Sequence, residues 1–354
     1  MTRLKAVIVG AGIAGLSTAW WLDEAGGNSI IVERATSLRE NRYIIALSGT
    51  CLATLERMGL RERLTSAACA FNRNAFHDNK GREVIRVSYS DIMRDIPFLN
   101  LRRSELIRVL ADAVAESASI LFGQTVDEIA DHGDNIEVKL YSTETIHGGF
   151  LVGADGFCSQ VRQQIAKPEE SLEPQGYRMA VYDVESHINL EPGCVSYTTP
   201  GPLAIFYCLP GGEDRLGLLK EVGKGSHSLV QDMLKRAEEE GASLVTDNLT
   251  LINPPRWSRG RIILGAGMTL VASEILGKAI NATPDLSTTL PNYEKQMRPA
   301  ITRRQSRVRS LAAAYLAKGT VAFHTRSVLL RLTLRWAMAY YHRKGINEEI
   351  MVTQ

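Results

Sequence analysis

The opening 33 residues carry the pattern that most constrains how this chain can fold. An apolar run from Lys5 to Val9 predicts a buried strand, and a helical pattern from about Ile13 to Ala25 follows it. A second apolar run, Ser29 to Val32, leads to Glu33. The link between the first strand and the helix carries three glycines at GxGxxG spacing: Gly10, Gly12 and Gly15. Together these features predict one complete strand–helix–strand unit of a parallel sheet.

Each of these glycines has a separate physical task in a turn that binds a dinucleotide. Gly10 permits the tight turn, Gly12 lets a pyrophosphate approach bare backbone, and Gly15 lets the helix pack close to the strand. The first helical residues, Ile13 and Ala14, present unpaired N–H groups and the positive end of the helix dipole to the phosphates.

Glu33 lies where such a site needs an acidic residue, at the end of the second strand. Its carboxylate would accept hydrogen bonds from the adenosine ribose hydroxyls, and an acid at this position disfavours a 2′-phosphate. A glycine-rich turn alone also occurs for purely structural reasons, but here the strand, the helix and the acid agree. We therefore expect this unit to bind the ADP half of a dinucleotide such as FAD.

The composition excludes several classes of partner. Among 354 residues, 41 are basic and 39 acidic, and the resulting net charge of +2 gives no field that attracts nucleic acid. The five cysteines are widely spaced without a CxxC pair, which predicts no metal site, reduced thiols and a cytoplasmic location. Basic residues before the first apolar run resemble a signal peptide, but glycines interrupt the run and a first strand explains it better.

The patterning changes twice along the chain. Helical patterns over Leu52–Leu64 and Ser104–Ser117 precede a hairpin pattern formed by Asn135–Tyr141 and Thr145–Val152. Short β-rich runs predominate between about residues 168 and 254, and Arg261–Leu264 then restores a buried strand. This order predicts a β-rich domain inserted into the domain that the opening unit begins.

Two helical patterns close the chain, Tyr293–Ala317 and Val328–His342. The second mixes arginines with leucines and a tryptophan, and such a helix can make peripheral contact with a membrane surface. Packing against the protein's own core or a second subunit is the alternative, and the oligomeric state stays open.

Six segments of the chain match the motifs of one known family: VIVGAGIAGL (Val7–Leu16), Glu33-Arg34, Leu47–Leu60 ending in LERMGL, RSEL (Arg103–Leu106), GADGFCSQVR (Gly153–Arg162) and YEKQMRP (Tyr293–Pro299). In these segments the chain resembles flavoprotein monooxygenases of the para-hydroxybenzoate hydroxylase type. The resemblance covers about the first 165 residues and, in altered form, residues 255–310. It implies FAD as cofactor, NAD(P)H as transient reductant, and transfer of one oxygen atom from O2 to a small molecule.

The resemblance also implies a fold and its boundaries. The expected class is α/β, with a Rossmann-like FAD-binding domain of the glutathione-reductase type, an inserted, mostly antiparallel β substrate domain, and C-terminal helices. The FAD-binding domain is expected in two parts, and the expected segments in chain order are 1–167, 168–254, 255–312 and 313–354.

Further cofactor contacts follow from the resemblance. It places Arg34, Arg103, Asp155 and Gly156 beside the cofactor. From the residues alone, Asp155 could equally be a helix N-cap in a tight turn, and Arg103 a solvated arginine before a helix.

The family's third motif is altered in this chain. That motif is a strand followed by Gly-Asp, a small-residue run with a proline, and a glycine-rich turn that opens a long helix. The corresponding segment here is Gly265-Ala266-Gly267-Met268, and the stretch Leu276–Leu290 is short and polar, so we expect the helix start to be missing. Ala266 replaces the aspartate that would hold the ribityl hydroxyls, and loss of one charge-assisted hydrogen bond costs about 1.5–3 kcal/mol. Gly265 and Ala266 are still expected to border the cofactor.

Three functions remain open from the sequence. The first is an FAD-dependent monooxygenase that hydroxylates or epoxidises an apolar organic substrate of specialised metabolism. The second is the same scaffold without oxygen chemistry, acting as a non-redox cyclase or isomerase, and the third is a non-catalytic accessory protein. The pocket residues expected from the middle-domain strands are Arg178, Tyr197 and Tyr207. No catalytic acid or base can be named, because the histidines are isolated.

Overall fold

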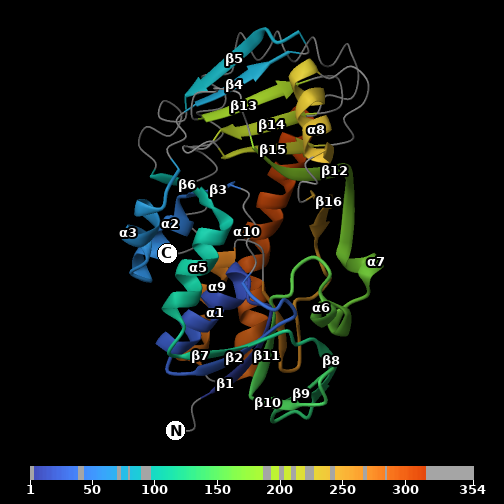
Figure 1. The fold of residues 1–354 in the computed structure, drawn as a ribbon. Helices are drawn as coiled ribbons and strands as arrows, with labels where there is room; N and C mark the ends of the chain where they lie inside the picture. Colours follow the sequence, from blue (N-terminus) through green and yellow to red (C-terminus); the bar gives the residue numbers. More distant parts are fainter. Residues whose placement is uncertain are drawn as a thin grey trace.

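The structure, a computed structural model, has two large sheets connected by one long helix (Figure 1). It describes residues 4–38, 44–69, 73–78, 80–88, 97–185, 193–198, 203–208, 213–219, 227–239, 244–265, 269–283 and 285–315. The helices are α1 (Ile13–Glu24), α2 (Thr50–Arg57), α3 (Arg61–Ser66), α5 (Arg103–Ala113), α6 (Gln160–Ile165), α7 (Pro168–Ser171), α8 (Ser228–Glu239), α9 (Thr269–Ala282) and α10 (Leu286–Tyr315).

The first sheet begins with the predicted strand–helix–strand unit. Its six strands lie in the order β17 (Ser258–Arg259), β18 (Ile262–Leu264), β11 (Phe150–Gly153), β1 (Lys5–Val9), β2 (Asn28–Glu33) and β7 (Ala118–Phe122). All neighbouring pairs are parallel except β17 and β18. The carboxyl ends of β1, β2, β7, β11 and β18 therefore meet at one edge, which is where ligands bind in such sheets.

Alternate residues of β1 show how the two faces of this sheet are covered. The side chain of Ile8 faces Gly15 in α1, whereas that of Val7 faces Gly148 in a small antiparallel sheet. Helices α1, α5 and α9 cover the first face, and the small sheet covers the second (Figure 1). The small sheet consists of β8 (Val126–Asp131), β9 (Ile136–Leu140) and β10 (Thr145–Gly148). Burial on both faces explains why the strands of the parallel sheet are continuous apolar runs.

The second sheet has seven strands and is mostly antiparallel. Its order is β16 (Leu244–Ile252), β12 (Leu172–Glu185), β15 (Glu213–Leu219), β14 (Leu203–Cys208), β13 (Gly193–Thr198), β4 (Arg73–His77) and β5 (Glu83–Ser88). Only the β13–β4 pair is parallel. The strands β4 and β5 precede residue 168, so the opening part of the chain contributes to this sheet. The predicted α/β class, with a parallel sheet and a separate antiparallel one, is confirmed, and the segment boundaries remain predictions.

Helix α10 connects the two layers. It begins beside α9, and its thirty residues correspond to a length of about 45 Å. Near its end, Arg309 forms an ion pair with Glu173 in β12, and the side chain of Gln305 donates to the carbonyl of Ile252 in β16. The helix begins seven residues before the predicted Tyr293, because Asp285 accepts a hydrogen bond from the backbone N–H of Ser287 at its start. The second C-terminal pattern, Val328–His342, lies outside the described residues.

Two predicted elements are divided by glycines. The helix expected over Leu52–Leu64 ends at Arg57 and restarts as α3, because Gly59 has φ +70° and turns the chain. The strand expected over Thr145–Val152 is split at Gly149 into β10 and β11, which belong to different sheets. A short pair formed by β3 (Ile44–Ser48) and β6 (Phe98–Arg102) leads into α2 and α5.

The expectation of a missing helix start after β18 is wrong. Helix α9 begins at Thr269, with four residues between it and the end of β18, and continues to Ala282. The stretch Leu276–Leu290 is therefore the end of α9 and the beginning of α10. Most of α9 is buried against α1 and α2, and this packing stabilises the helix. The polar residues of its final turn give no sign of a helix in the sequence.

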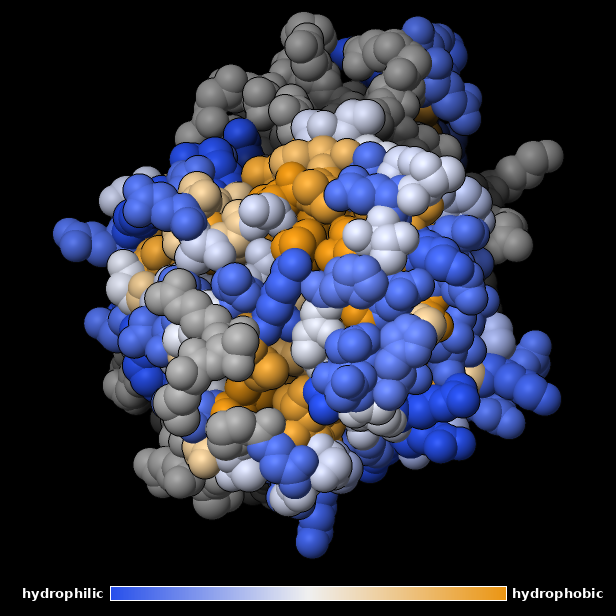
Figure 2. All heavy atoms as spheres, turned by 90° about the horizontal axis from the view of Figure 1, so that it is seen from below, coloured by the Kyte–Doolittle hydropathy of each residue, from blue (hydrophilic) through white to orange (hydrophobic). Residues whose placement is uncertain are grey.

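The end of the molecule that carries the parallel sheet has a mixed surface. Figure 2 shows this face from below, with apolar side chains among hydrophilic ones. Among the described residues, the large apolar side chains that are clearly exposed are Phe122, 37% exposed at the end of edge strand β7, and Tyr141, 67% exposed. No helix within the described ranges has the length and apolar character needed to cross a bilayer.

Candidate functional site

The glycine turn has the geometry that the sequence predicts. Gly10 has φ +108°, and a side chain there would place its Cβ 2.4 Å from the carbonyl oxygen of Ala154. A Cβ on Gly15 would lie 1.9 Å from the carbonyl oxygen of Gly10, so α1 can approach β1 only without one. Both glycines are therefore required by the fold itself.

Gly12 differs from the other two glycines because no described residue fills the space beside it. A Cβ on Gly12 would meet no atom nearer than 3.9 Å, and the atom at that distance is Nη2 of Arg103. Gly12 is also the N-cap of α1, and no side chain caps this helix, whose first residues are Ile13 and Ala14. An open space beside uncapped N–H groups and a guanidinium is suited to an anion such as a pyrophosphate.

Arg103 reaches this position because of the strand before it. The strand β6 ends at Arg102, and Arg103 is the first residue of α5, which packs against α1. Arg103 is half-buried, and its guanidinium borders the open space beside Gly12, while its contact with a cofactor stays a prediction.

Glu33 is almost fully buried at the end of β2, 7% exposed. Its Oε2 accepts a hydrogen bond of 2.8 Å from the backbone N–H of Ala11, and its Oε1 accepts one of 2.9 Å from that of Ala35. The carboxylate therefore fixes the glycine turn as well as facing the predicted ribose site.

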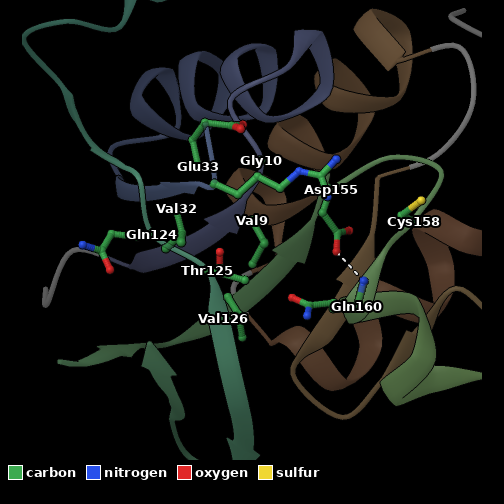
Figure 3. Close-up of a pocket in the computed structure, with 11 residues that line it drawn as sticks. Val9, Gly10, Val32, Glu33, Gln124, Thr125, Val126, Asp155, Cys158 and Gln160 are labelled. Carbon is green, nitrogen blue, oxygen red and sulfur yellow. Dashed lines mark hydrogen bonds between the residues drawn. The ribbon is translucent and has the colours of Figure 1, made fainter. Parts of the chain in front are cut away.

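A cavity of about 140 Å³ opens beside the turn, at the carboxyl edge of the parallel sheet (Figure 3). Its lining comes from the ends of β1, β2 and β7 and from the loop after β11: Val9, Gly10, Val32, Glu33, Arg34, Gln124, Thr125, Val126, Asp155, Cys158 and Gln160. The structure thus brings Gly10, Glu33, Arg34 and Asp155 together as predicted. The sequence did not single out Gln124–Val126, although their place after a strand parallel to β2 is a usable signal.

The loop after β11 is held by two side chains. Oδ2 of Asp155 accepts hydrogen bonds from the backbone N–H groups of Gln160 at 2.7 Å and Val161 at 3.2 Å. Arg162, only 4% exposed, donates to the carbonyl oxygens of Gly156 at 3.2 Å and Phe157 at 2.6 Å. Burial lowers the pKa of Arg162, although nearby Asp155 acts in the opposite direction. Ser159 is the N-cap of α6, and Asp155 accepts from the N–H groups of the next two residues from outside the helix, so Asp155 is not the N-cap itself. It also lines the cavity, and its contact with a cofactor stays a prediction.

The third segment is only partly described. The backbone N–H of Gly265 donates to the carbonyl of Gly153 at 2.8 Å, and a Cβ on Gly265 would lie 3.7 Å from that of Ala14. Gly265 therefore lies at the same sheet edge as the turn. Ala266 lies outside the described residues.

The three predicted pocket residues do not lie together. Tyr197 in β13 is 9% exposed, and its ring stacks between His77, at 5.2 Å between centroids, and His227, at 4.7 Å. Because Tyr207 in β14 pairs with Cys194, it lies on the opposite face of the sheet from Tyr197. Arg178 lies in β12 opposite Asn248, and its side chain is not among those described.

A parallel sheet with a glycine turn at a helix start, an acid at the end of β2 and a cavity at its carboxyl edge is the arrangement of a dinucleotide-binding protein. The sequence matches the family described as "FAD binding domain" over residues 3–199, more than half of the chain, and this protein belongs to that family. Family membership confirms the predicted class, an FAD-dependent monooxygenase of the para-hydroxybenzoate hydroxylase type with FAD as cofactor.

Known proteins agree with this assignment. The chain is 25% identical over 342 residues to the uncharacterized protein Rv1260 of Mycobacterium tuberculosis (strain ATCC 25618 / H37Rv), covering 85% of this chain and 92% of that protein. It is 30% identical over 173 residues to the FAD-dependent monooxygenase asL4 of Sarocladium schorii, covering 48% of this chain and 40% of asL4. The crystal structure of Klebsiella pneumoniae HpxO complexed with FAD and uric acid superposes with a TM-score of 0.78 at 18% identity, covering 97% of this chain and 96% of HpxO. At that identity the likeness to HpxO concerns the fold.

Proposed function

We propose that this FAD-dependent monooxygenase uses NAD(P)H and O2 to hydroxylate or epoxidise an apolar organic molecule of specialised metabolism. The observation that carries the proposal is the glycine turn, where Gly12 leaves open space beneath Arg103 and Glu33 borders the adjoining cavity. A protein in which this turn served only the fold would have no physical reason to keep that space open.

The residues present fit the ADP half of FAD. The N–H groups at the start of α1 and the guanidinium of Arg103 would hold the pyrophosphate, and Glu33 would accept from the ribose hydroxyls. Arg34 and the segment Gln124–Val126 would border the adenine, and Asp155 would close the opposite wall of the cavity. Gly156, the next residue of the same loop, is proposed to contact the cofactor there. When bound, FAD supplies the redox chemistry with O2, and the protein supplies position and exclusion of water.

The side chains on one face of the seven-stranded sheet support the proposal of an apolar substrate. Helix α8 packs against this sheet, and His227, directly before α8, covers Tyr197 on one face. The opposite face carries Tyr207 together with Leu203, Ile205 and the buried hydroxyl of Ser196. We therefore propose Tyr207 as a pocket residue in preference to Tyr197, and Arg178 remains a proposal. A cytoplasmic location and a small-molecule partner belong to the same proposal.

The test is a turnover assay on purified full-length protein. The visible spectrum is expected to show bound flavin, NADH or NADPH oxidation is expected to require O2, and labelled O2 is expected to place one labelled oxygen atom in the product. A panel of apolar phenols, polyketides and terpenoids serves as substrate, with the Gly12→Ala variant as the negative control. Bound flavin without O2-dependent oxidation of either nicotinamide, across the panel, contradicts the proposal.

One observation favours a second candidate, a non-redox cyclase or isomerase on the same scaffold. Only four residues, 265–268, connect β18 to α9, and they include no carboxylate or hydroxyl that could hold a ribityl chain. Conversion of a substrate without consumption of NAD(P)H or O2 would establish this function instead.

A further inference from the structure

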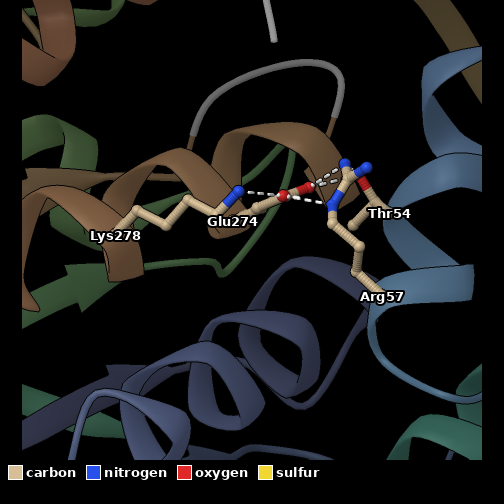
Figure 4. Close-up of polar contacts among 4 residues, drawn as sticks. All are labelled: Thr54, Arg57, Glu274 and Lys278. Carbon is tan, nitrogen blue, oxygen red and sulfur yellow. Dashed lines mark hydrogen bonds and ion pairs between the residues drawn. The ribbon is translucent and has the colours of Figure 1, made fainter. Parts of the chain in front are cut away.

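A buried carboxylate joins two helices close to the cofactor side of the parallel sheet (Figure 4). Glu274 lies in α9, and its side chain is only 2% exposed. Its Oε1 accepts from Nε of Arg57 at 2.5 Å and from Nζ of Lys278 at 2.6 Å. Its Oε2 accepts from Nη2 of Arg57 and from the hydroxyl of Thr54, both at 2.6 Å. Glu274 therefore binds α9 to α2 through a two-point contact with Arg57.

The cluster defined by Glu274, Arg57, Thr54 and Lys278 is costly to build. A buried carboxylate is tolerated only where donors satisfy it, and well-packed apolar side chains often serve stability equally well. Burial alone would raise the pKa of Glu274, but hydrogen bonds from Arg57, Lys278 and Thr54 outweigh it, and the pKa is lowered. Glu274 is thus charged at neutral pH. An ionic contact of fixed geometry is best suited to holding two helices in one relative position.

The adjacent residue holds α9 to a third helix. The hydroxyl of Ser273 lies 2.9 Å from the hydroxyls of both Ser17 and Thr18 in α1. It also donates to the carbonyl of Thr269 at 2.8 Å, the first residue of α9. Helix α1 is the helix that begins at the glycine turn. Residues 273 and 274, in the second turn of α9, therefore hold this end of the helix to α1 on one side and to α2 on the other.

The other side of the cluster leads to the same turn by a different route. Helix α2 follows β3, which pairs with β6 along its whole length. The strand β6 continues into α5, where Arg103 extends over Gly12. Arg103 is also held over Gly12 by the direct packing of α5 against α1, so its position does not depend on Glu274. The contact between Glu274 and Arg57 therefore acts mainly on the start of α9.

We propose that Glu274 is a positioning residue for FAD, which acts through Arg57 to set the start of α9 relative to the glycine turn. The ADP half would lie at the turn and beside Glu33, and the contacts that set this geometry come from Ala154, Glu33 and α5 and do not include Glu274. The remainder of FAD would extend from the pyrophosphate toward the segment that begins at Gly265 and leads into α9, because Gly265 lies beside Ala14 at the start of α1. Loss of the contact therefore weakens binding of whole FAD while leaving the affinity for ADP unchanged. The inference rests on FAD binding and is independent of the substrate and of oxygen chemistry.

The test compares two ligands on one variant. Flavin-free full-length protein and its Glu274→Gln variant are titrated with FAD and with ADP by calorimetry. The Kd for FAD is expected to rise at least tenfold, and the Kd for ADP is expected to change less than twofold. The visible spectrum and the fluorescence of bound FAD are expected to shift toward those of free FAD, a change that a purely structural role would not produce.

The matched control is Glu294→Gln in α10. Glu294 is also largely buried, pairs with Arg298 and accepts from the backbone N–H of Trp257, but it lies away from the glycine turn. This variant is expected to keep the wild-type ratio of the two Kd values. Glu274→Gln overturns the proposal if it raises both Kd values by the same factor or leaves the ratio unchanged.

A milder variant covers the case in which Glu274→Gln does not fold. The side chain of Arg57 is 40% exposed, so Arg57→Gln removes the two-point contact at a smaller cost to the core. A selective rise in the Kd for FAD of at least threefold is expected for this variant. A wild-type ratio in folded Arg57→Gln contradicts the proposal.

Discussion

Gly12→Ala is expected to weaken FAD binding while it leaves the stability of the flavin-free protein nearly unchanged. The added methyl group meets no atom of the described residues nearer than 3.9 Å, and φ −83°, ψ −173° at this position is an extended conformation that alanine adopts freely. Alanine is a poorer N-cap than glycine, which costs about 0.5–1 kcal/mol. Alanine also lowers the conformational entropy of the unfolded chain, which stabilises the folded state by about 0.4–1 kcal/mol and offsets this cost. The free energy of unfolding of the flavin-free protein is therefore expected to stay within about 1 kcal/mol of wild type.

Binding of FAD responds differently to the same change. The methyl group occupies the space through which a phosphate reaches the N–H groups at the start of α1. Loss of one charge-assisted hydrogen bond costs about 1.5–3 kcal/mol, equivalent to a rise in Kd of about 10- to 150-fold. Urea unfolding measures the free energy of unfolding of the flavin-free protein, and flavin fluorescence titration measures the Kd for FAD. Gly15→Ala serves as contrast, since its Cβ would lie 1.9 Å from a carbonyl oxygen and must destabilise the flavin-free protein. A Gly12→Ala protein that binds FAD with wild-type affinity would refute the reasoning.

Three further predictions concern carboxylates. Glu33→Gln turns an amide N–H2 toward a backbone donor at Ala11 or Ala35, so urea unfolding should show a loss of about 1–3 kcal/mol, and an unchanged midpoint would contradict this. The lowered pKa of Glu274 means that its stabilising contribution is complete above the ordinary value of 4.5 and is lost as pH falls through its folded-state pKa. The stability difference between wild type and Glu274→Gln should therefore shrink in acid, and parallel pH profiles would argue against it. Asp155→Ala removes the acceptor of two N–H groups at α6, and a fall in unfolding free energy of about 1 kcal/mol is expected by the same assay.

The opening unit could be predicted from sequence because its determinants are local. The apolar period identifies β1, α1 and β2, and the spacing of Gly10, Gly12 and Gly15 follows from contacts within a few residues of the turn. The points at which a helix or strand ends inside such a pattern are harder to predict. Gly59 and Gly149 lie within continuous apolar patterns, and only the tertiary structure decides that each ends an element there.

The remainder of the site depends on contacts that are distant in sequence. The pairing of β4 with β13 brings His77 beside Tyr197, and a local sequence pattern cannot predict a contact between residues 120 positions apart. Tyr197 and Tyr207 have similar surroundings in the sequence, yet strand register places them on opposite faces. The pairing of Glu274 with Arg57 likewise arises from the packing of α9 on α2, since a single glutamate in a helical pattern ordinarily predicts an exposed residue.

The central claim is that the turn around Gly12 and the carboxylate of Glu33 hold the ADP half of FAD. A crystal structure of the full-length protein with FAD tests it most directly. The account predicts pyrophosphate oxygens within about 3 Å of the backbone nitrogens at the start of α1, and ribose hydroxyls within the same distance of Glu33. A structure with FAD bound elsewhere, and with the turn and its adjoining cavity empty, would contradict it.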